Sequence, residues 1–360
     1  MTERIPPADP SQSLWSSVDR LIDTAVRARD GGVDGLLTHQ LGPLGARAFE
    51  EARRPVPVLL REAQRSASFA SLLAPQLVRR IRDAVDGQLL VVKGPEVAAL
   101  YPPAGRRFSD LDLLAPNAAA VQAELLRSGF VEVAEEHGRL EDHHHLHPIR
   151  FPQIWLDVEL HSAPNWPLRA PPPPLDEILE AAVPSALAID GVSAPLRLHH
   201  ALLLAAHAWR HEPLHRLGDL LDVAVLAEGL PSAELEQTAR RWGIGRIWQT
   251  TWGAVEAVFY DGSATLPMRI WAAHLATARE RTVLEEHLQR WLHPYWELPL
   301  HRALVNSGRM VAADLRPADE TWRSKLGRIF DAIRHARTPA ARRDAASGSR
   351  SQGDRRRTRD

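Results

Sequence analysis

The sequence has no cysteine among its 360 residues. Disulfide scaffolds, thiolate zinc sites, iron–sulfur clusters and cysteine nucleophiles are therefore excluded. Because structural disulfides belong mainly to oxidising compartments, a chain without cysteine fits the cytoplasm, and we expect the protein there.

Long apolar runs and the common phosphate-binding sequence are also absent. No stretch approaches the roughly 18 uninterrupted apolar residues that cross a bilayer, and the first residues lack the basic and then apolar pattern of a secretion signal. The G-x-x-x-x-G-K-[ST] sequence of P-loop kinases does not occur. We therefore expect neither a membrane partner nor P-loop chemistry.

Charge of one sign is not in excess either. The 44 basic and 45 acidic residues leave a net charge of -1. A surface built throughout to hold nucleic acid or anionic lipid would be strongly basic. We therefore expect any charged partner to be bound locally, and we find no strong nucleic-acid signature.

Periodicity and punctuation divide the chain into five parts. Apolar residues recur at helical spacing before residue 86 and again after residue 196, whereas short alternating runs lie between glycine and proline signals in the middle. A proline run follows the middle part, and the last residues are too poor in apolar side chains to fold. We expect an N-terminal helical region at 1–86, a core at 87–169, a Pro-rich linker at 170–195, a C-terminal helical domain at 196–337 and a disordered tail at 338–360.

The core contains five short runs that predict strands. The first is apolar, rich in branched residues and bounded by glycine on both sides. The others alternate, and Pro152 and Gln153 separate the last two at hairpin distance. The five runs are 89–92, 111–114, 130–136, 143–151 and 154–161. Together they predict an α/β (α+β) fold with a short mixed sheet between helical regions.

Two aspartates share one face of the second predicted strand. Asp110 and Asp112 are two residues apart, about 6.6 Å on a strand, while Leu111 and Leu113 point to the other face. Paired carboxylates on a core strand need a cation, and Mg²⁺ prefers oxygen ligands and often completes its shell with substrate phosphates. Because Asp-x-Asp is a common pattern, an exposed strand edge is the alternative explanation.

A glycine turn precedes this strand. Lys93-Gly94-Pro95 ends the first strand and begins a helix, where free backbone N–H groups and a partial positive charge favour an anion. Gly94 would let a phosphate approach the backbone. The alternative is an ordinary tight turn with a solvated lysine.

A second acidic strand is predicted at the end of the core. Asp157, Glu159 and His161 fall on one of its faces, with apolar residues between them on the other. A third carboxylate beside a metal-bound pair can bind one cation and act as general base towards an attacking hydroxyl. Spacing alone leaves both Asp157 and Glu159 open for that role.

Two arginines, Arg106 and Arg107, come just before the Asp-x-Asp strand. A guanidinium there could clamp a triphosphate, and of the two we favour Arg106. A salt bridge that holds the acidic turn together is the alternative.

Two groups of histidines raise the question of a different metal site. His143, His144, His145 and His147 form a run, and imidazoles two apart on a strand can share zinc. No clear further ligands are spaced nearby, and Pro148 interrupts the strand, so we favour an ordinary polar strand over substrate contact or zinc.

The second group lies on a predicted helix pair. His207 and His211 are four apart, and Asp219 and Asp222 follow on the next helix. The sequence lacks His-Glu-x-x-His, so hydrogen bonds between the two helices explain the pattern more simply than a metal site.

Taken together, these segments resemble an uncharacterised nucleotidyltransferase family of the DNA polymerase β-like superfamily. The resemblance runs loosely from about residue 15 to 310, and residues 89–161 carry its specific motifs. Those motifs are Val91-Val92-Lys93-Gly94, Leu100-Tyr101-Pro102, Arg106, Ser109-Asp110-Leu111-Asp112-Leu113-Leu114 and Val158-Glu159-Leu160-His161.

This resemblance implies a polymerase-β-like nucleotidyltransferase core that uses Mg²⁺ or Mn²⁺. In it, Gly94 matches the phosphate-side turn, Asp110 and Asp112 the metal-binding pair and Glu159 the third acid, with Asp157 as its rival. The chain departs from the superfamily's commoner Gly-Ser or Gly-Gly turn. It also has Ser-Ala-Pro after His161, where relatives usually have an aromatic residue.

The implied reaction moves a nucleoside monophosphate from an NTP, such as ATP, to an acceptor and releases pyrophosphate. The acceptor is open between a small molecule, a peptide, a protein and tRNA. We assign Asp110, Asp112, Glu159 and Asp157 as catalytic candidates, the first three also as metal ligands, and Lys93, Gly94, Arg106, Arg107 and Ser109 as nucleotide-binding candidates. Possible substrate-side residues are His161, His145, His147, His207 and Asp222.

Two other functions remain open. One is an inactive member of the same fold whose helical half binds a partner. The other is a histidine-based metal hydrolase, which would need His145 and His147 to converge with further ligands.

Overall fold

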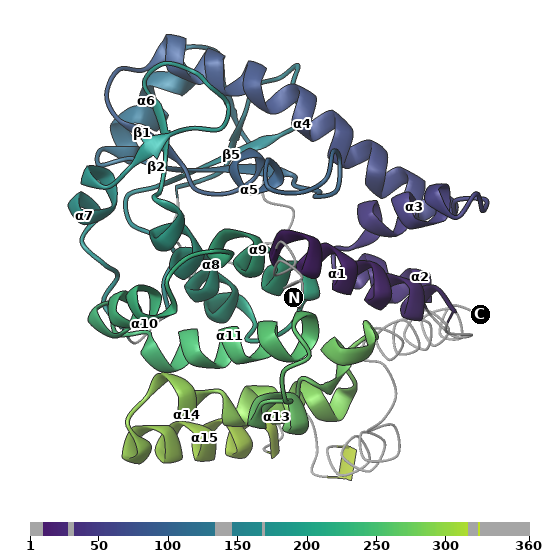
Figure 1. The fold of residues 1–360 in the computed structure, drawn as a ribbon. Coiled ribbons are helices and arrows are strands. Elements are labelled where there is room, and N and C mark those ends of the chain that lie inside the picture. The colour runs from purple at the N-terminus through teal and green to yellow at the C-terminus, as the bar shows by residue number, and fades with distance from the viewer. Residues whose placement is uncertain (1–9, 28–31, 134–145, 168–169, 316–322, 325–360) are drawn as a thin grey trace, which may run out of the picture.

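The computed structural model describes residues 10–27, 32–133, 146–167, 170–315 and 323–324. Helices lie before and after a central sheet in this part of the chain (Figure 1). The predicted α/β (α+β) fold with a short mixed sheet is therefore confirmed. The predicted tail at 338–360 lies outside the described residues.

Four helices precede the sheet in the part of the chain that the structure describes. In the first, Leu14, Val18 and Ile22 are fully buried, because their spacing places them on one side of a helix with 3.6 residues per turn. The fourth helix spans 27 residues and continues through Pro75. The four are α1 (Pro10–Arg27), α2 (Gly32–Thr38), α3 (Gly42–Glu51) and α4 (Val58–Ala84).

The sheet has seven strands in the described residues, in the order β3-β4-β5-β2-β1-β7-β6. The second strand pairs antiparallel with the first and parallel with the fifth, so the sheet is mixed. The first five strands are β1 (Leu89–Val91), β2 (Asp110–Leu114), β3 (Val131–Glu132), β4 (Ile149–Arg150) and β5 (Asp157–His161). Each of the five predicted runs contributes one of them, although β3 and β4 are short.

The segment 170–195, which we expected to be a Pro-rich linker, contains the rest of the sheet. It forms α7 (Leu175–Glu180), β6 (Val183–Pro184) and β7 (Val192–Ala194). β7 pairs parallel with β1, and Leu89 lies opposite Val192. A three-residue strand has too little alternation to be recognised in a sequence, and here pairing with β1 forms it.

One face of the sheet is apolar and covered by helices. Leu111 and Leu113 of β2 and Val158 and Leu160 of β5 are buried in one cluster with residues of α4 and α6 (Ala118–Arg127). Since side chains alternate along a strand, the residues between these leucines and valines point to the opposite face. That opposite face carries the acidic residues.

Helices α8 and α9 pack against each other and belong to the core on the opposite side of the sheet. Leu90 and Leu114 are buried in the same cluster as residues of both helices. Four tryptophans, Trp209, Trp242, Trp248 and Trp271, are buried there as well. The helices are α8 (Arg197–His211), α9 (Leu217–Ala227), α10 (Ser232–Arg241), α11 (Gly245–Phe259), α12 (Leu266–Ile270), α13 (Val283–Leu292), α14 (Pro294–Glu297) and α15 (Leu300–Leu315), with the 3₁₀ helix η1 (Ala273–Thr277).

Over the described part of the chain, no helix combines the length and the apolar character that crossing a bilayer requires.

Candidate functional site

The register between β2 and β5 places acidic residues opposite one another. Asp112 lies opposite Glu159, and Asp110 lies opposite Asp157. Because both strands are parallel and alternate with period two, all four side chains stand on the same face of the sheet. The predicted juxtaposition of the two acidic strands is therefore present.

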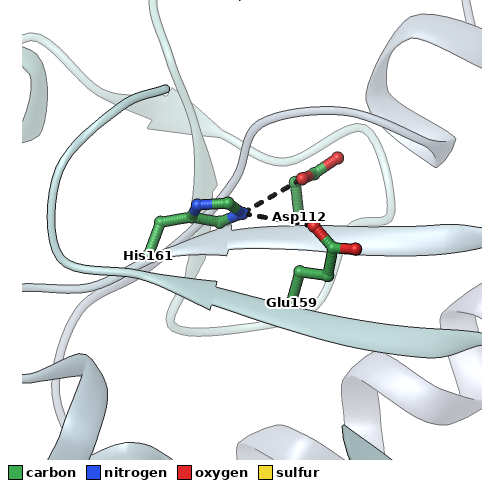
Figure 2. Close-up of side chains that lie close together, drawn as sticks. All are labelled: Asp112, Glu159 and His161. Carbon is green, nitrogen blue, oxygen red and sulfur yellow. Dashed lines mark hydrogen bonds and ion pairs between the residues drawn. The ribbon is translucent and has the colours of Figure 1, made fainter. Parts of the chain in front are cut away.

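The pair at Asp112 is completed by a histidine. One ligand atom each from Asp112, Glu159 and His161 lies within 4.8 Å of the others. Figure 2 shows the three side chains pointing toward one another. His161 Nε2 donates a hydrogen bond of 3.1 Å to Asp112 Oδ1 and lies 3.8 Å from Glu159 Oε2. Asp112 and His161 are buried, whereas Glu159 is partly exposed. Two carboxylates and one imidazole form a donor set that fits a divalent metal ion.

The pair at Asp110 is different, because Asp157 has a cationic partner. Arg150 of β4 donates from Nε to Asp157 Oδ1 at 2.6 Å. Both side chains are partly exposed. Of the two residues that we considered as the third acid, the structure groups Glu159 with Asp112 and pairs Asp157 with Arg150.

The pKa values of the two aspartates of β2 are shifted in opposite directions. Burial opposes the ionisation of Asp112, but the hydrogen bond from His161 and the positive charge of Lys93 outweigh it, so the pKa of Asp112 lies well below its ordinary value. Burial raises the pKa of Asp110, and the negative charge of Asp112 raises it further, against the attraction of Lys93 and Arg106. Asp110 is thus the carboxylate that has most to gain from an added cation.

The turn at Lys93–Gly94 lies beside this strand. Gly94 has φ +62°, and a Cβ on it would come within 3.2 Å of the Asp110 carbonyl oxygen and 3.3 Å of the Phe108 ring. Both the backbone conformation and the close approach require glycine. The helix that follows, α5 (Pro95–Ala98), is one turn long, so it supplies a smaller dipole than the sequence suggested.

A cleft of about 650 Å³ opens between this core and the helical half of the chain. Its walls come from the start of α3, the 93–94 turn, the segment before β2, and α8 and α9. A smaller cavity of about 30 Å³ adjoins it and is lined by Asp112 and His161, and Lys93 and His207 line both spaces. The candidate residues Lys93, Gly94, Arg106, Arg107, Ser109, Asp110, His207 and Asp222 all line the larger cleft.

Arg106 is held by a carboxylate across this cleft. It donates from Nε to Asp222 Oδ1 and from Nη2 to Oδ2, both at 2.7 Å, and from Nη1 to the Gly94 carbonyl oxygen at 3.2 Å. Tyr101 also donates its hydroxyl to Asp222 Oδ1 at 2.7 Å. Burial opposes the charge on Arg106, but Asp222 outweighs it and raises the pKa of the guanidinium. The salt bridge considered as the alternative for Arg106 is present, with its partner in the helical half.

Two other arginines at the cleft are not held in this way. Arg107 and Arg216, the residue before α9, form neither hydrogen bonds nor ion pairs through their side chains with the rest of the described chain. Arg107 and Ser109 are exposed. A guanidinium that faces a cleft without a carboxylate partner can bind phosphate.

The histidine candidates fall into separate groups. His207 Nε2 is hydrogen-bonded to Lys93 Nζ, and His211 packs beside His207 on the next turn of α8. His147 is exposed and is not among the residues that line either cavity, and His145 lies outside the described residues.

The sequence reasoning missed His200 and Arg216. His200 of α8 is 3% exposed and donates from Nε2 to the Val92 carbonyl oxygen. One signal could have found it: His200, His207 and His211 recur at intervals of seven and four on a predicted helix, which places them on one face. Arg216 has no comparable signal, because only the fold brings it to the cleft.

The comparisons with known proteins match the chain to one family. A family model described as "Uncharacterised nucleotidyltransferase" matches residues 20–259, which span the N-terminal helices, the sheet, α8, α9 and α11. Neither the curated proteins nor the solved structures contain a match to the chain.

Proposed function

The chain belongs to the uncharacterised nucleotidyltransferase family, and we propose that it transfers a nucleoside monophosphate from an NTP to an acceptor hydroxyl or phosphate. In this reaction an acceptor oxygen forms a bond to the α-phosphorus and the bond to the β-phosphate oxygen breaks. Pyrophosphate leaves with the electron pair of that bond, and the acceptor proton passes to a carboxylate of the site.

The observation that carries the proposal is the pairing of two acidic strands at the edge of a cleft that also presents Lys93, Arg107 and Arg216. Asp112 lies opposite Glu159 in the β2–β5 register, and Asp110 lines the cleft on the same strand. Placing three carboxylates together on one partly buried face is unfavourable unless cations neutralise them. The fold therefore supports a site for divalent metal with a nucleotide beside it.

Asp110, Asp112 and Glu159 would hold the metal, Mg²⁺ or Mn²⁺, with His161 in reach of the same position. When bound, such ions activate the acceptor oxygen and neutralise the developing charge on the leaving group. Asp157, which Arg150 holds, would serve to fix β4 against β5.

The triphosphate would lie in the 650 Å³ cleft. Lys93 and Arg107 would contact its phosphate oxygens from the core, and Arg216 would do so from the helical half. Arg106 would not bind phosphate directly, because Asp222 occupies its guanidinium in a bidentate pair. The cleft leaves the acceptor open between a small molecule, a peptide, a protein and tRNA.

The test is transfer of label from an NTP in the presence of Mg²⁺ or Mn²⁺ and a cell extract. Label in the α-phosphate should appear on an acceptor, while label in the γ-phosphate should leave as pyrophosphate. Asp110→Asn should abolish the labelling, and Asp190→Asn, an exposed acid of the loop before β7, should not. Transfer of the γ-label, or α-labelling that survives Asp110→Asn, would contradict the proposal.

The same labelling experiment tests the first alternative, and the geometry of the histidines bears on the second. An inactive partner-binding protein would show no labelling under any metal. For a histidine-based hydrolase, His147 lies exposed and outside the Asp112–Glu159–His161 group in the described part of the chain, so the geometry there favours the nucleotidyltransferase.

A further inference from the structure

Three successive residues of the nucleotide-side turn are tied to the helical half of the chain. Val92 is contacted by His200, Lys93 by His207, and Gly94 by Arg106, which Asp222 holds. His200 and His207 lie on α8, seven residues apart, and Asp222 lies on α9. Helix α8 and its neighbour α9 thus contact the backbone of Val92 and Gly94 and the side chain of Lys93, in a segment that belongs to no strand or long helix.

In the first contact an imidazole donates. His200 Nε2 faces a carbonyl oxygen, so this nitrogen carries the proton. Burial lowers the pKa of His200 to about 4, which keeps the ring neutral at physiological pH. The position of the Val92 carbonyl is therefore fixed by a side chain that α8 keeps 3% exposed.

The second contact needs a neutral imidazole that accepts. Lys93 Nζ has only donors, so His207 Nε2 must carry the lone pair. Burial, and then the charge of Lys93, lower the pKa of His207 well below its ordinary value. One N–H of the ammonium is used by His207, and two others remain for ligands in the cleft that both residues line.

The third contact passes through an ion pair. Arg106 donates to the Gly94 carbonyl oxygen, and the bidentate pair with Asp222 holds the guanidinium in one orientation. Gly94 has a positive φ, and a glycine without contacting residues could adopt many other backbone conformations. The ion pair removes that freedom at the residue where the turn approaches Asp110 most closely.

We propose that His200, His207 and Asp222 are positioning residues, through which the helical half holds the Lys93–Gly94 turn in the geometry that binds the phosphates of the nucleotide. The inference rests on the proposed function. It assigns to α8 and α9 a part in nucleotide selection: they set how well the turn distinguishes a triphosphate from a monophosphate. A residue that acts in this way changes the contribution of the phosphates to the free energy of nucleotide binding. It leaves the contribution of the base and ribose unchanged.

The experiment compares the affinity of the full-length protein for an NTP with its affinity for the corresponding NMP, using mant-labelled nucleotides and Mg²⁺. His207→Leu should weaken NTP binding about ten-fold, because one hydrogen bond to a charged group is lost. The same change should leave NMP binding nearly unchanged. His200→Leu should act in the same direction. His207→Gln should restore most of the NTP affinity, because its amide oxygen can accept from Lys93.

The matched control is His199→Leu. His199 is the neighbour of His200 on α8 and is 8% exposed by side chain, but it faces Trp242 and Glu177, away from the turn. This variant should keep the NTP to NMP affinity ratio of the wild type. Asp222→Asn is less informative, because it leaves a buried guanidinium without its carboxylate and risks unfolding.

Two results would overturn the inference. One is an unchanged NTP to NMP ratio in His207→Leu and His200→Leu proteins that melt near the wild-type temperature. The other is an equal loss in His199→Leu. If His200→Leu does not fold, the two His207 variants decide alone, since His207 is only partly buried.

The outcome also separates this inference from the function on which it rests. If the wild type binds no nucleotide with any metal, both fail. If the wild type transfers the α-label but the His207 variants keep its nucleotide affinities, the proposed function stands and the positioning role of the helical half is wrong.

Discussion

The strand pair β2–β5 carries two rungs of carboxylates that look alike and have different surroundings. In one rung, Asp112 faces Glu159, with His161 completing a buried group. In the other, Asp110 faces Asp157, which is taken by Arg150 of the neighbouring strand. The same register and residue types thus lead to a ligand group in one place and to a partly exposed ion pair in the other.

The difference comes from the strand next to β5. β4 ends within reach of Asp157 and supplies a guanidinium there, and Arg150 lies directly opposite Asp157 in the antiparallel register. A carboxylate with a cationic partner is less available to a metal. We therefore expect Asp112 and Glu159 to matter for catalysis, and Asp157 to matter for local structure.

The largest effect should follow a change to the first rung. Asp112→Asn should lower α-label transfer at least about a thousand-fold, because a catalytic metal supplies several kcal/mol to the barrier. It should also destabilise the metal-free protein. The folded pKa of Asp112 is lower than the unfolded value of 3.8, so its ionised form stabilises the fold above that pH, and the contribution is lost as the pH falls through the folded pKa. Urea unfolding in EDTA measures the second effect.

Asp110→Asn should lower transfer to a similar extent but change stability in the opposite direction. The folded pKa of Asp110 lies above 3.8, so its ionised form destabilises the metal-free fold at neutral pH. The variant should therefore unfold at higher urea than the wild type at pH 7. The gap should close as the pH falls through the folded pKa and then below 3.8, where the wild-type carboxyl is protonated in both states. A variant that is less stable at pH 7 would contradict the contrast between the two aspartates.

Glu159→Gln and Asp157→Asn test the two rungs against each other. Glu159→Gln should lower transfer about a hundred-fold, as loss of a metal-site ligand or its support does. Asp157→Asn should leave transfer nearly unchanged and cost less than about 1 kcal/mol of stability, since both members of its ion pair are partly exposed. The reverse order of activities would assign the third acid to Asp157.

The smallest effect concerns His161. If its imidazole is a ligand, His161→Gln should weaken Zn²⁺ binding about ten-fold and Mg²⁺ binding much less, because Zn²⁺ accepts imidazole nitrogen and Mg²⁺ prefers oxygen. Calorimetric titration of each metal into the apo protein measures both. An equal change for the two metals would mean that His161 only orients Asp112 through their hydrogen bond.

The sequence alone predicted which side chains share a face of a single strand, because that depends on local backbone geometry. Alternation predicted that Asp110 and Asp112 share a face, and the buried positions of Leu111 and Leu113 agree with it. Glycine at 94 was predicted to make a turn, and its positive φ and close contact with the Asp110 carbonyl require that residue. These features depend on residues close together in the chain.

Those local rules could not predict contacts between residues that are distant in the sequence. Arg106 was expected at a phosphate, and nothing in its own segment predicted that Asp222, over a hundred residues later, would pair with it. β7 was taken as part of a linker, and β1 recruits it into the sheet. The first outcome depends on how the helical half packs on the core and the second on strand pairing within the sheet, and no local pattern encodes either.

The amino-acid sequence alone therefore determined that acidic side chains would line single strand faces and that a glycine turn would precede them, because backbone geometry repeats every two residues. Only the tertiary structure decided that Asp112 meets Glu159, that Arg150 takes Asp157 and that α8 and α9 hold the turn. Pairing register and helix packing arise from the burial of apolar surface over the whole domain, so they emerge only when the chain is folded.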